Sequence, residues 1–120
     1  MNADWQSFLE QHGARVASGE ISDFGDGDAE LRAAASAGVV ADLSHLGVLH
    51  FTGADAEAFL QGQLSCDVKG IDASRATLGA YCTPKGRMLA DFFLLRYEGG
   101  FAMLLARALV APIQKLSLIH

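Results

Sequence analysis

The alternation of apolar and polar residues in the second half of the chain predicts an antiparallel β-sheet. Four runs rich in β-branched and aromatic residues are bounded by turn-forming residues. They span residues 47–52, 77–82, 87–97 and 101–106. Pro84 and Gly86 fit the second and fourth positions of a type I turn, and Glu98-Gly99-Gly100 forms a second turn. The last three runs are therefore expected to be consecutive strands joined by two hairpins.

Helical periodicity appears on both sides of the predicted sheet. Apolar residues recur at helical spacing behind a cap at Asn2 and stop at Gly13, and residues 29–37 again favour a helix. The polar, glycine-rich residues 18–28 between these helices predict a loop. A third helix is expected to begin near Ala54, because two acidic residues there suit a first helical turn.

The end of the chain predicts one more helix. Its apolar stripe consists of Leu109, Ile113, Leu116 and Leu118, and Pro112 fits only if it lies in the first turn. The complete pattern predicts an α+β fold, in which helices pack mainly on one face of the antiparallel sheet. We expect a single domain over residues 1–120, with residues 1–40 as a lead-in of helix and loop and residues 41–120 as the core.

Composition and charge narrow the classes of function. The chain has 120 residues with 51% hydrophobic side chains, enough for one core, and a net charge of -5. That charge argues against direct nucleic-acid binding, which depends on cationic surfaces. The first residues lack the basic and apolar segments of a secretory signal or a membrane anchor. We therefore expect a cytoplasmic protein without a direct membrane partner.

Metal-binding and redox motifs are not indicated. Cys66 and Cys82 are too far apart for a Cys-x-x-Cys site, so we interpret them as reduced core thiols. The three aspartates of residues 23–28 lack the closing glutamate of a calcium loop and are interpreted as a solvated acidic loop. His50 has no second ligand nearby and is interpreted as structural. No metal site and no catalytic residue are predicted.

Three features between residues 59 and 91 have both a functional and a structural interpretation. Gly62 weakens the helix that places Gln63 on its edge, which fits either close packing or the approach of a ligand. Lys85 and Arg87 flank the hairpin turn and could hold a carboxylate or phosphate, or they could be solvated. The run 88–97 is apolar on both faces, which predicts an inner strand of the sheet. Asp91 lies in this run, so it is either a cavity carboxylate or the partner of a cation or of backbone amides.

These motifs carry a resemblance to a known family. The segments DLSHLGVLHFTGADAEAFLQGQLSCDV and LGAYCTPKGRMLADFFLLRYEGGFAMLLARALVAPIQKL resemble the N-terminal part of the YgfZ-type folate-binding proteins. These proteins are related to the glycine-cleavage T-protein, an aminomethyltransferase. The resemblance covers roughly residues 42–116 and implies the first domain of the T-protein-like fold.

The resemblance also implies a function and a site. It implies a tetrahydrofolate cofactor and a role in supporting iron–sulfur cluster assembly or repair and tRNA-modifying enzymes, with iron–sulfur proteins as partners. Gln63, Lys85, Arg87 and Asp91 are the candidate folate-binding residues. The aminomethyltransferase branch has paired aspartates where this chain has Ala90-Asp91, and this difference favours the YgfZ branch. A fragment of a folate-dependent aminomethyltransferase and a purely structural domain are the alternatives.

Length separates this chain from the full-length family members. Those proteins are longer and carry a motif of the type KGCYxGQE in the C-terminal half, whereas the sequence has no such motif. We therefore expect an N-terminal part of a longer protein that does not act as an enzyme by itself. We further expect its uncovered apolar surface to favour self-association.

Overall fold

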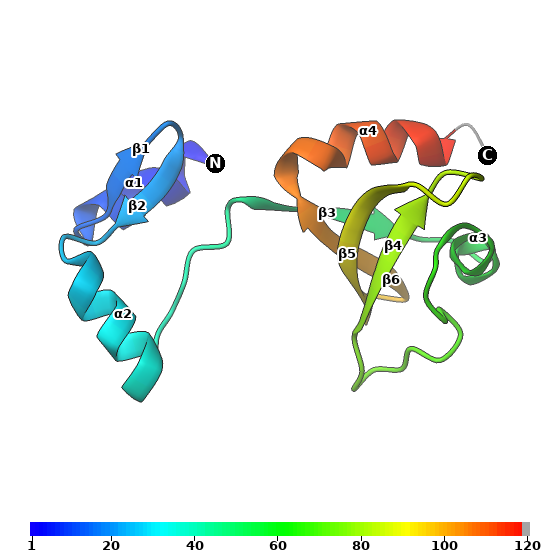
Figure 1. The fold of residues 1–120 in the computed structure, drawn as a ribbon, viewed down its shortest axis with the longest axis horizontal. Coiled ribbons are helices and arrows are strands. Elements are labelled where there is room, and N and C mark those ends of the chain that lie inside the picture. The colour runs from blue at the N-terminus through cyan, green and yellow to red at the C-terminus, as the bar shows by residue number, and fades with distance from the viewer. Residues whose placement is uncertain (119–120) are drawn as a thin grey trace. The chain divides into compact units, whose positions relative to one another are not determined.

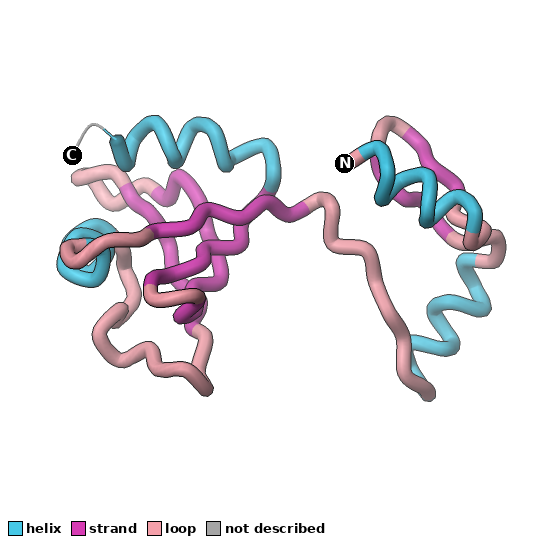
Figure 2. Tube along the Cα trace, turned by 180° about the vertical axis from the view of Figure 1, so that it is seen from behind, coloured by secondary structure: helices cyan, strands magenta, loops and turns pink. Residues whose placement is uncertain are grey.

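The computed structural model describes the backbone of residues 1–118 and the side chains of residues 1–115. The chain divides into two compact units, Met1–His45 and Leu46–His120. Figure 1 and Figure 2 show the helices and strands of each unit from opposite sides. The single domain expected over the whole chain stays a prediction.

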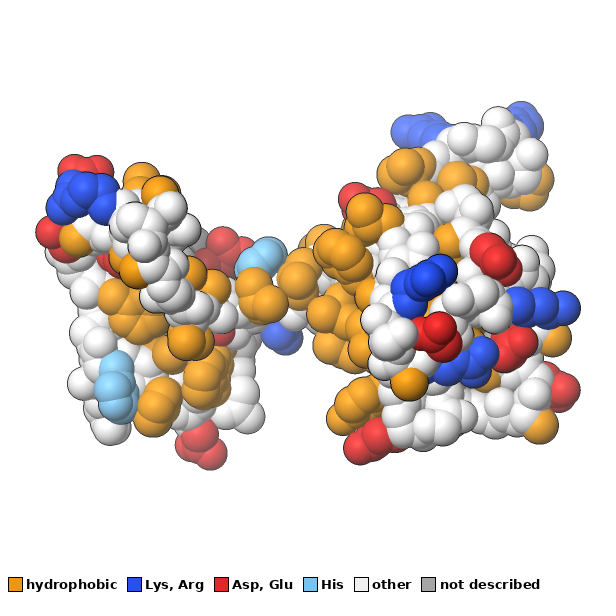
Figure 3. Space-filling model, turned by 90° about the horizontal axis from the view of Figure 1, so that it is seen from below, with side chains coloured by type: hydrophobic (Ala, Val, Ile, Leu, Met, Phe, Trp, Pro, Cys, Tyr) orange, Lys and Arg blue, Asp and Glu red, His pale blue; other side chains and the backbone are white. Residues whose placement is uncertain are grey.

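The first unit contains two helices and a small hairpin. Its elements are α1 (Ala3–Gln11), β1 (Arg15–Ala17), β2 (Glu20–Asp23) and α2 (Gly27–Ser36). The predicted cap of α1 is confirmed, since Asn2 Oδ1 accepts hydrogen bonds from the backbone N–H groups of Asp4 and Trp5. Among the residues described in this unit, Leu9 and Ala14 are the buried hydrophobic ones. Figure 3 shows hydrophobic side chains on its surface.

The loop predicted for residues 18–28 is wrong in part, because this segment contains strand β2 and the start of α2. Ser18 and Gly19 both have positive φ angles, of 52° and 77°, which is the geometry of a tight hairpin turn between β1 and β2. The side chains of Arg15 and Asp23 pair across the hairpin, with Nη2 2.7 Å from Oδ2. Asp26 caps α2 by accepting from the N–H of Ala29. The acidic residues therefore organise local structure.

The second unit contains the predicted antiparallel sheet. Its elements are β3 (Leu46–Phe51), α3 (Ala56–Gln63), β4 (Thr77–Cys82), β5 (Met88–Tyr97), β6 (Gly100–Ala106) and α4 (Arg107–Leu118). The strand order is β3-β6-β5-β4, and all neighbours are antiparallel. All four predicted strands are confirmed to within one residue at each end, and the α+β fold is confirmed with them.

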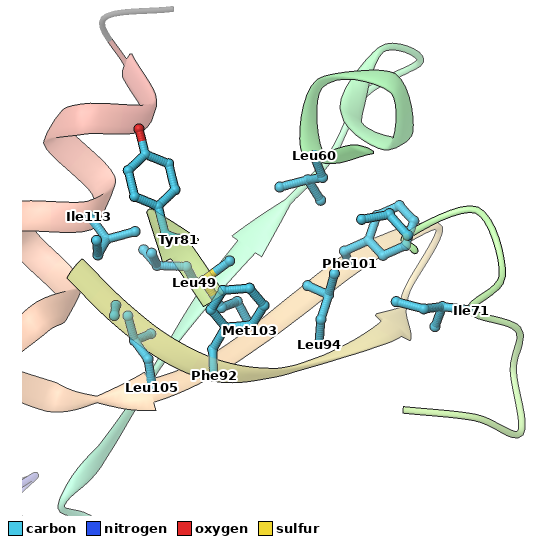
Figure 4. Packing of buried hydrophobic residues seen from close by; sticks show 12 residues of the cluster. Leu49, Leu60, Ile71, Tyr81, Phe92, Leu94, Phe101, Met103, Leu105 and Ile113 are labelled. Atoms are coloured by element: carbon cyan, nitrogen blue, oxygen red, sulfur yellow. The ribbon is translucent and has the colours of Figure 1, made fainter. Parts of the chain in front are cut away.

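One face of this sheet forms the hydrophobic core together with α3 and α4. Leu60 of α3 and Ile113 of α4 belong to the same buried cluster as the inward-facing strand residues (Figure 4). Those strand residues are Leu49, Tyr81, Ala90, Phe92, Leu94, Phe101, Met103 and Leu105. Each large apolar side chain buried in this way contributes about 1.5–3 kcal/mol to the free energy of folding. Both helices therefore cover the same face, as predicted.

Pro112 departs from its expected position. It is an exposed residue inside α4, beyond the first helical turn, whereas the sequence predicted it within that turn. A proline at such a position removes one helical hydrogen bond and crowds the carbonyl four residues earlier. The burial of Ile113, which is 2% exposed, and the packing of Leu109 against the core keep the helix continuous despite that cost. The side chains of Leu116 and Leu118 lie outside those described.

Strand β5 is an inner strand, as predicted, but only one of its faces is buried. Ala90, Phe92 and Leu94 point into the core, whereas Asp91 and Phe93 alternate with them on the exposed face. The sequence suggested burial on both sides, because this run is apolar on both faces. We call the exposed side of the sheet, opposite α3 and α4, the outer face.

Candidate functional site

Helix α3 carries the first candidate residue and is fixed to the sheet by its neighbours. Glu57 in its first turn suits the helix dipole, and Leu60 anchors the helix in the core with 1% exposure. The helix begins at Ala56, two residues after the predicted start. Gln63 is its last residue and is half-buried.

The segment after α3 runs along strand β4. Leu64 forms an antiparallel bridge with Tyr81, and the N–H of Ser65 donates to the carbonyl of Ala80 at 3.0 Å. In return, the N–H of Ala80 donates to Ser65 Oγ at 2.8 Å. Because this pairing is antiparallel, Gln63 lies beside the last residue of β4, next to the β4–β5 hairpin. Figure 1 and Figure 2 both show α3 beside that hairpin.

The turn of this hairpin presents the two candidate cations. The N–H of Gly86 donates to the carbonyl of Thr83 at 2.8 Å, which confirms the turn predicted from Pro84 and Gly86. Thr83 Oγ1 also accepts from the N–H of Arg87 at 3.1 Å. Gly86 has a φ angle of 82°, a conformation that favours glycine. We call residues 83–87 the hairpin tip.

The charged groups of the hairpin tip are available to a ligand. Lys85 and Arg87 are exposed, and neither side chain has an ion pair or hydrogen bond to the side chains and backbone that the structure describes. An exposed cation without a partner contributes little to stability. A guanidinium and an ammonium on a fixed turn can bind a carboxylate or phosphate through charge-assisted hydrogen bonds.

Gly62 faces open space next to Gln63. A Cβ atom added at this position would have no described atom within 4 Å, and the residue is exposed. Close packing against the chain's own backbone, one of the two interpretations of this glycine, is therefore wrong for the described residues. The helix carries a glycine, at a cost of about 1 kcal/mol relative to alanine, where nothing in the described part of the chain requires one.

Asp91 does not join the other candidates. Its carboxylate is exposed on the outer face of the sheet, opposite Ala80 in the ladder, and it has no hydrogen-bond partner among the described residues. The structural interpretation, a buried carboxylate paired with a cation or with amides, is therefore wrong, and so is a carboxylate enclosed in a cavity. The structure brings Gln63, Lys85 and Arg87 to one end of the sheet and leaves Asp91 four residues along β5 from Arg87.

Arg96 is a residue of this region that sequence reasoning missed. Its Nε donates to the carbonyl of Ile71 at 2.8 Å, and its Nη2 lies 2.7 Å from Glu57 Oε2. Its guanidinium also sits 4.5 Å from the ring centroid of Phe101. These contacts tie α3, the α3–β4 loop and the sheet together. A lone arginine at the end of a long apolar strand was the signal in the sequence.

The cysteines and His50 have structural surroundings. Cys66 and Cys82 are free and half-buried, and burial raises the pKa of the Cys66 thiol, which keeps it protonated at neutral pH. His50 Nε2 lies 3.2 Å from the carbonyl oxygen of Tyr97, and the two rings meet edge to face. The described residues include no cluster of three or more metal-ligating side chains.

The first unit contains a groove of about 440 Å³ that sequence reasoning did not predict. Residues of β2, α2 and the segment after α2 line it, among them Ile21, Phe24, Ala33, Val39 and Val40. Its acidic side chains are already engaged: Asp23 binds Arg15, and Glu30 accepts from the N–H of Phe24. Asp42 accepts from Trp5 Nε1 at 2.8 Å and from Ser44 Oγ at 2.6 Å. The free lining is mainly apolar.

Comparisons with known proteins agree with the predicted resemblance. Residues 10–113 match the model of the family described as GCVT N-terminal domain. The tRNA-modifying protein YgfZ of Vibrio vulnificus strain YJ016 is 42% identical over 62 residues, which is 52% of this chain and 19% of that protein. YgfZ of Edwardsiella ictaluri is 39% identical over 70 residues, which is 58% of this chain and 21% of that protein.

The matched region spans about a fifth of the length of these relatives. Among the helices in the described part of the chain, none has both the length and the apolar composition that crossing a bilayer requires.

Proposed function

Because the chain belongs to the GCVT N-terminal domain family, we propose that it contributes one wall of a tetrahydrofolate site in a YgfZ-type protein. By analogy with the relatives named tRNA-modifying protein, this protein supports tRNA modification. The resemblance to the YgfZ-type folate-binding proteins extends the proposed role to the assembly or repair of iron–sulfur clusters. Iron–sulfur proteins are the partners that this role requires.

The observation that carries the proposal is the convergence of Gln63 and the hairpin tip. A reduced folate has a ring system that donates and accepts hydrogen bonds and a glutamate tail with carboxylates. The half-buried amide of Gln63 can bind the ring system, and Lys85 and Arg87 can bind the carboxylates. When bound, the folate would supply one-carbon chemistry, while these residues hold and orient it.

The exposed surface at Gly62 fits the same ligand. The absence of a side chain, together with the absence of any described atom within 4 Å of a Cβ position, leaves room for a flat ring against the helix backbone. Aminomethyl transfer, the alternative from the sequence, is less well supported. Asp91, which stands where that branch has its paired aspartates, is exposed on the outer face, away from Gln63, whereas aminomethyl transfer needs an acid or base near the folate.

Calorimetric titration with tetrahydrofolate under reducing conditions tests this proposal. We expect saturable binding, and we expect Arg87→Gln to weaken it about three- to fivefold through the loss of one exposed charge contact. Arg75→Gln is the matched control, because Arg75 is also exposed but lies before the other end of β4. Heat without saturation at millimolar ligand, or equal losses in the two variants, would overturn the proposal.

A second pair of measurements tests the helix surface. In the absence of ligand, Gly62→Ala is expected to raise the free energy of unfolding by about 1 kcal/mol, since the added methyl group meets open space. The same variant should bind tetrahydrofolate more weakly, because the methyl group blocks the ring. A variant that is more stable and binds unchanged would exclude Gly62 from the site.

Asp91→Asn defines the extent of the site. The prediction that Asp91 binds folate requires the ligand to continue from the hairpin tip onto the outer face, about 13 Å along β5 at the usual rise per residue. Weaker binding by Asp91→Asn would support that longer path. Unchanged binding would restrict the site to α3 and the tip.

A further inference from the structure

The outer face of the sheet in the second unit carries a continuous apolar row across all four strands. Val48 of β3 pairs with Leu104 of β6, Leu104 pairs with Phe93 of β5, and Phe93 pairs with Leu78 of β4. Directly paired residues project their side chains on the same side of a sheet. The four side chains therefore form one line on the side opposite α3 and α4.

This row is exposed to solvent. Val48 is 60% exposed, Phe93 50% and Leu78 66%, and Leu89 and Tyr97 extend the apolar surface along β5. A sheet that is apolar on both faces is normally covered on both, because each apolar face is stabilised by a second layer. Contiguous exposed apolar surface of this kind marks an interaction site.

The ionisable side chains of the outer face are arranged around Leu104. Of the described residues on this face, Asp91 supplies the carboxylate and His50 the imidazole. His50 lies on β3, two residues beyond Val48, and Asp91 lies on β5, two residues before Phe93. Strands β3 and β5 flank β6 and run in the same direction, since both are antiparallel to it. His50 therefore lies one strand from Leu104 and two residues along in one direction. Asp91 lies one strand away on the other side and two residues along in the opposite direction.

We propose that two copies of this chain associate through their outer faces, sheet against sheet. The two-fold axis runs between the two sheets and passes over Leu104. Such an axis places the surface of one copy on the same surface of the other. The apolar rows then cover each other near their centre. Asp91 of each copy lies over His50 of its partner, where it can accept a hydrogen bond from the imidazole in place of the Tyr97 carbonyl that lies 3.2 Å from Nε2 within each copy.

The area of the outer face indicates a weak association. Four strands about 4.8 Å apart and about six residues long give roughly 400 Å² per copy, or about 800 Å² in total. Stable interfaces bury about 1,200–2,000 Å², so this dimer belongs with weak and transient complexes. The association should therefore be visible only at high protein concentration, above roughly 10 µM.

Sedimentation equilibrium over a concentration series tests the interface. The weight-average mass is expected to rise from 12.7 kDa towards twice that value and to stop there. Phe93→Lys should weaken the dimer at least about tenfold, because it puts a charge at the centre of the contact. Leu31→Lys is the control, since Leu31 is 73% exposed on α2 in the first unit. Circular dichroism would verify that both variants are folded.

A charge exchange tests the two-fold arrangement. His50→Asp places a carboxylate opposite Asp91 of the partner and should weaken the dimer about two- to fivefold, by like-charge repulsion. Adding Asp91→Lys restores an attractive pair on both sides of the axis and should recover the original affinity. A double variant no tighter than His50→Asp would overturn the axis at Leu104. A constant 12.7 kDa, open-ended growth, or equal effects of Phe93→Lys and Leu31→Lys would overturn the interface itself.

Discussion

At the scale of single residues, Gly100 fixes how closely strands β3 and β6 approach each other. A Cβ atom built at Gly100 would overlap the carbonyl oxygen of Phe51 and crowd the backbone of Thr52. The obstacle is backbone, so a change of side-chain rotamer cannot relieve it. Gly79, in contrast, faces the side chains of Cys66 and Phe92, which can adjust.

Gly100→Ala is therefore expected to lower the free energy of unfolding by about 2–4 kcal/mol, because the edge strand β3 must move to admit the methyl group. Urea denaturation measures this loss. Gly27→Ala is the matched control, since a Cβ at Gly27 has no described atom within 4 Å. Equal stabilities of the two variants would contradict the overlap at Phe51.

The indole of Trp5 gives the first unit a pH-dependent contact. Hydrogen bonds from Ser44 and from Trp5 Nε1 lower the pKa of Asp42 below its ordinary value. A carboxylate with a lowered pKa stabilises the fold above about pH 3.9, and that stabilisation is lost as the pH falls through the lower pKa of the folded state. The Trp5 emission should change with a midpoint below pH 3.9. The change should be absent in Asp42→Asn, and an identical titration in that variant would contradict the contact.

At the scale of elements, the sequence predicted best those strands that are long and apolar and are joined by turns with strong turn-forming residues. Strands β4, β5 and β6 were predicted closely, because proline and glycine fix both connecting turns and the strands are long and apolar. The β1–β2 hairpin was missed because its strands have three and four residues, and Ser18-Gly19 is a weaker turn signal. The exposed position of Asp91 could not be predicted, since an apolar run does not reveal which of its faces a second layer covers.

Pro112 offers a test at the same scale. Replacing it with alanine should raise the free energy of unfolding by about 1–3 kcal/mol, since it restores a helical hydrogen bond at an exposed position of α4. Part of the gain is offset because proline also restricts the unfolded chain. Thermal and urea unfolding of Pro112→Ala measure the difference. A loss of stability would mean that α4 needs the bend that proline introduces.

At the scale of the whole molecule, stability is expected to differ between the two units. Twelve buried hydrophobic residues form the core of the second unit, whereas Leu9 and Ala14 are the buried ones among the described residues of the first. Local opening free energies follow the density of buried apolar contacts.

Native-state hydrogen exchange should therefore give the amides of β5 and β6 the highest free energies of opening. The amides of α1 and α2 should have clearly lower free energies of opening. As the denaturant concentration rises, these amides should be the first to lose protection. Uniform protection across both units would show that they unfold as one cooperative body and would contradict this expectation.

The contacts of Arg96 have a kinetic consequence for the proposed folate site. Arg96 holds α3 through Glu57 and holds the α3–β4 loop through the carbonyl of Ile71, so Gln63 is positioned before any ligand arrives. A preorganised site loses little conformational entropy on binding and needs no prior rearrangement. The observed rate of folate binding should then rise linearly with ligand concentration. Releasing the helix with Arg96→Met should introduce a plateau, which is the signature of a slow closing step.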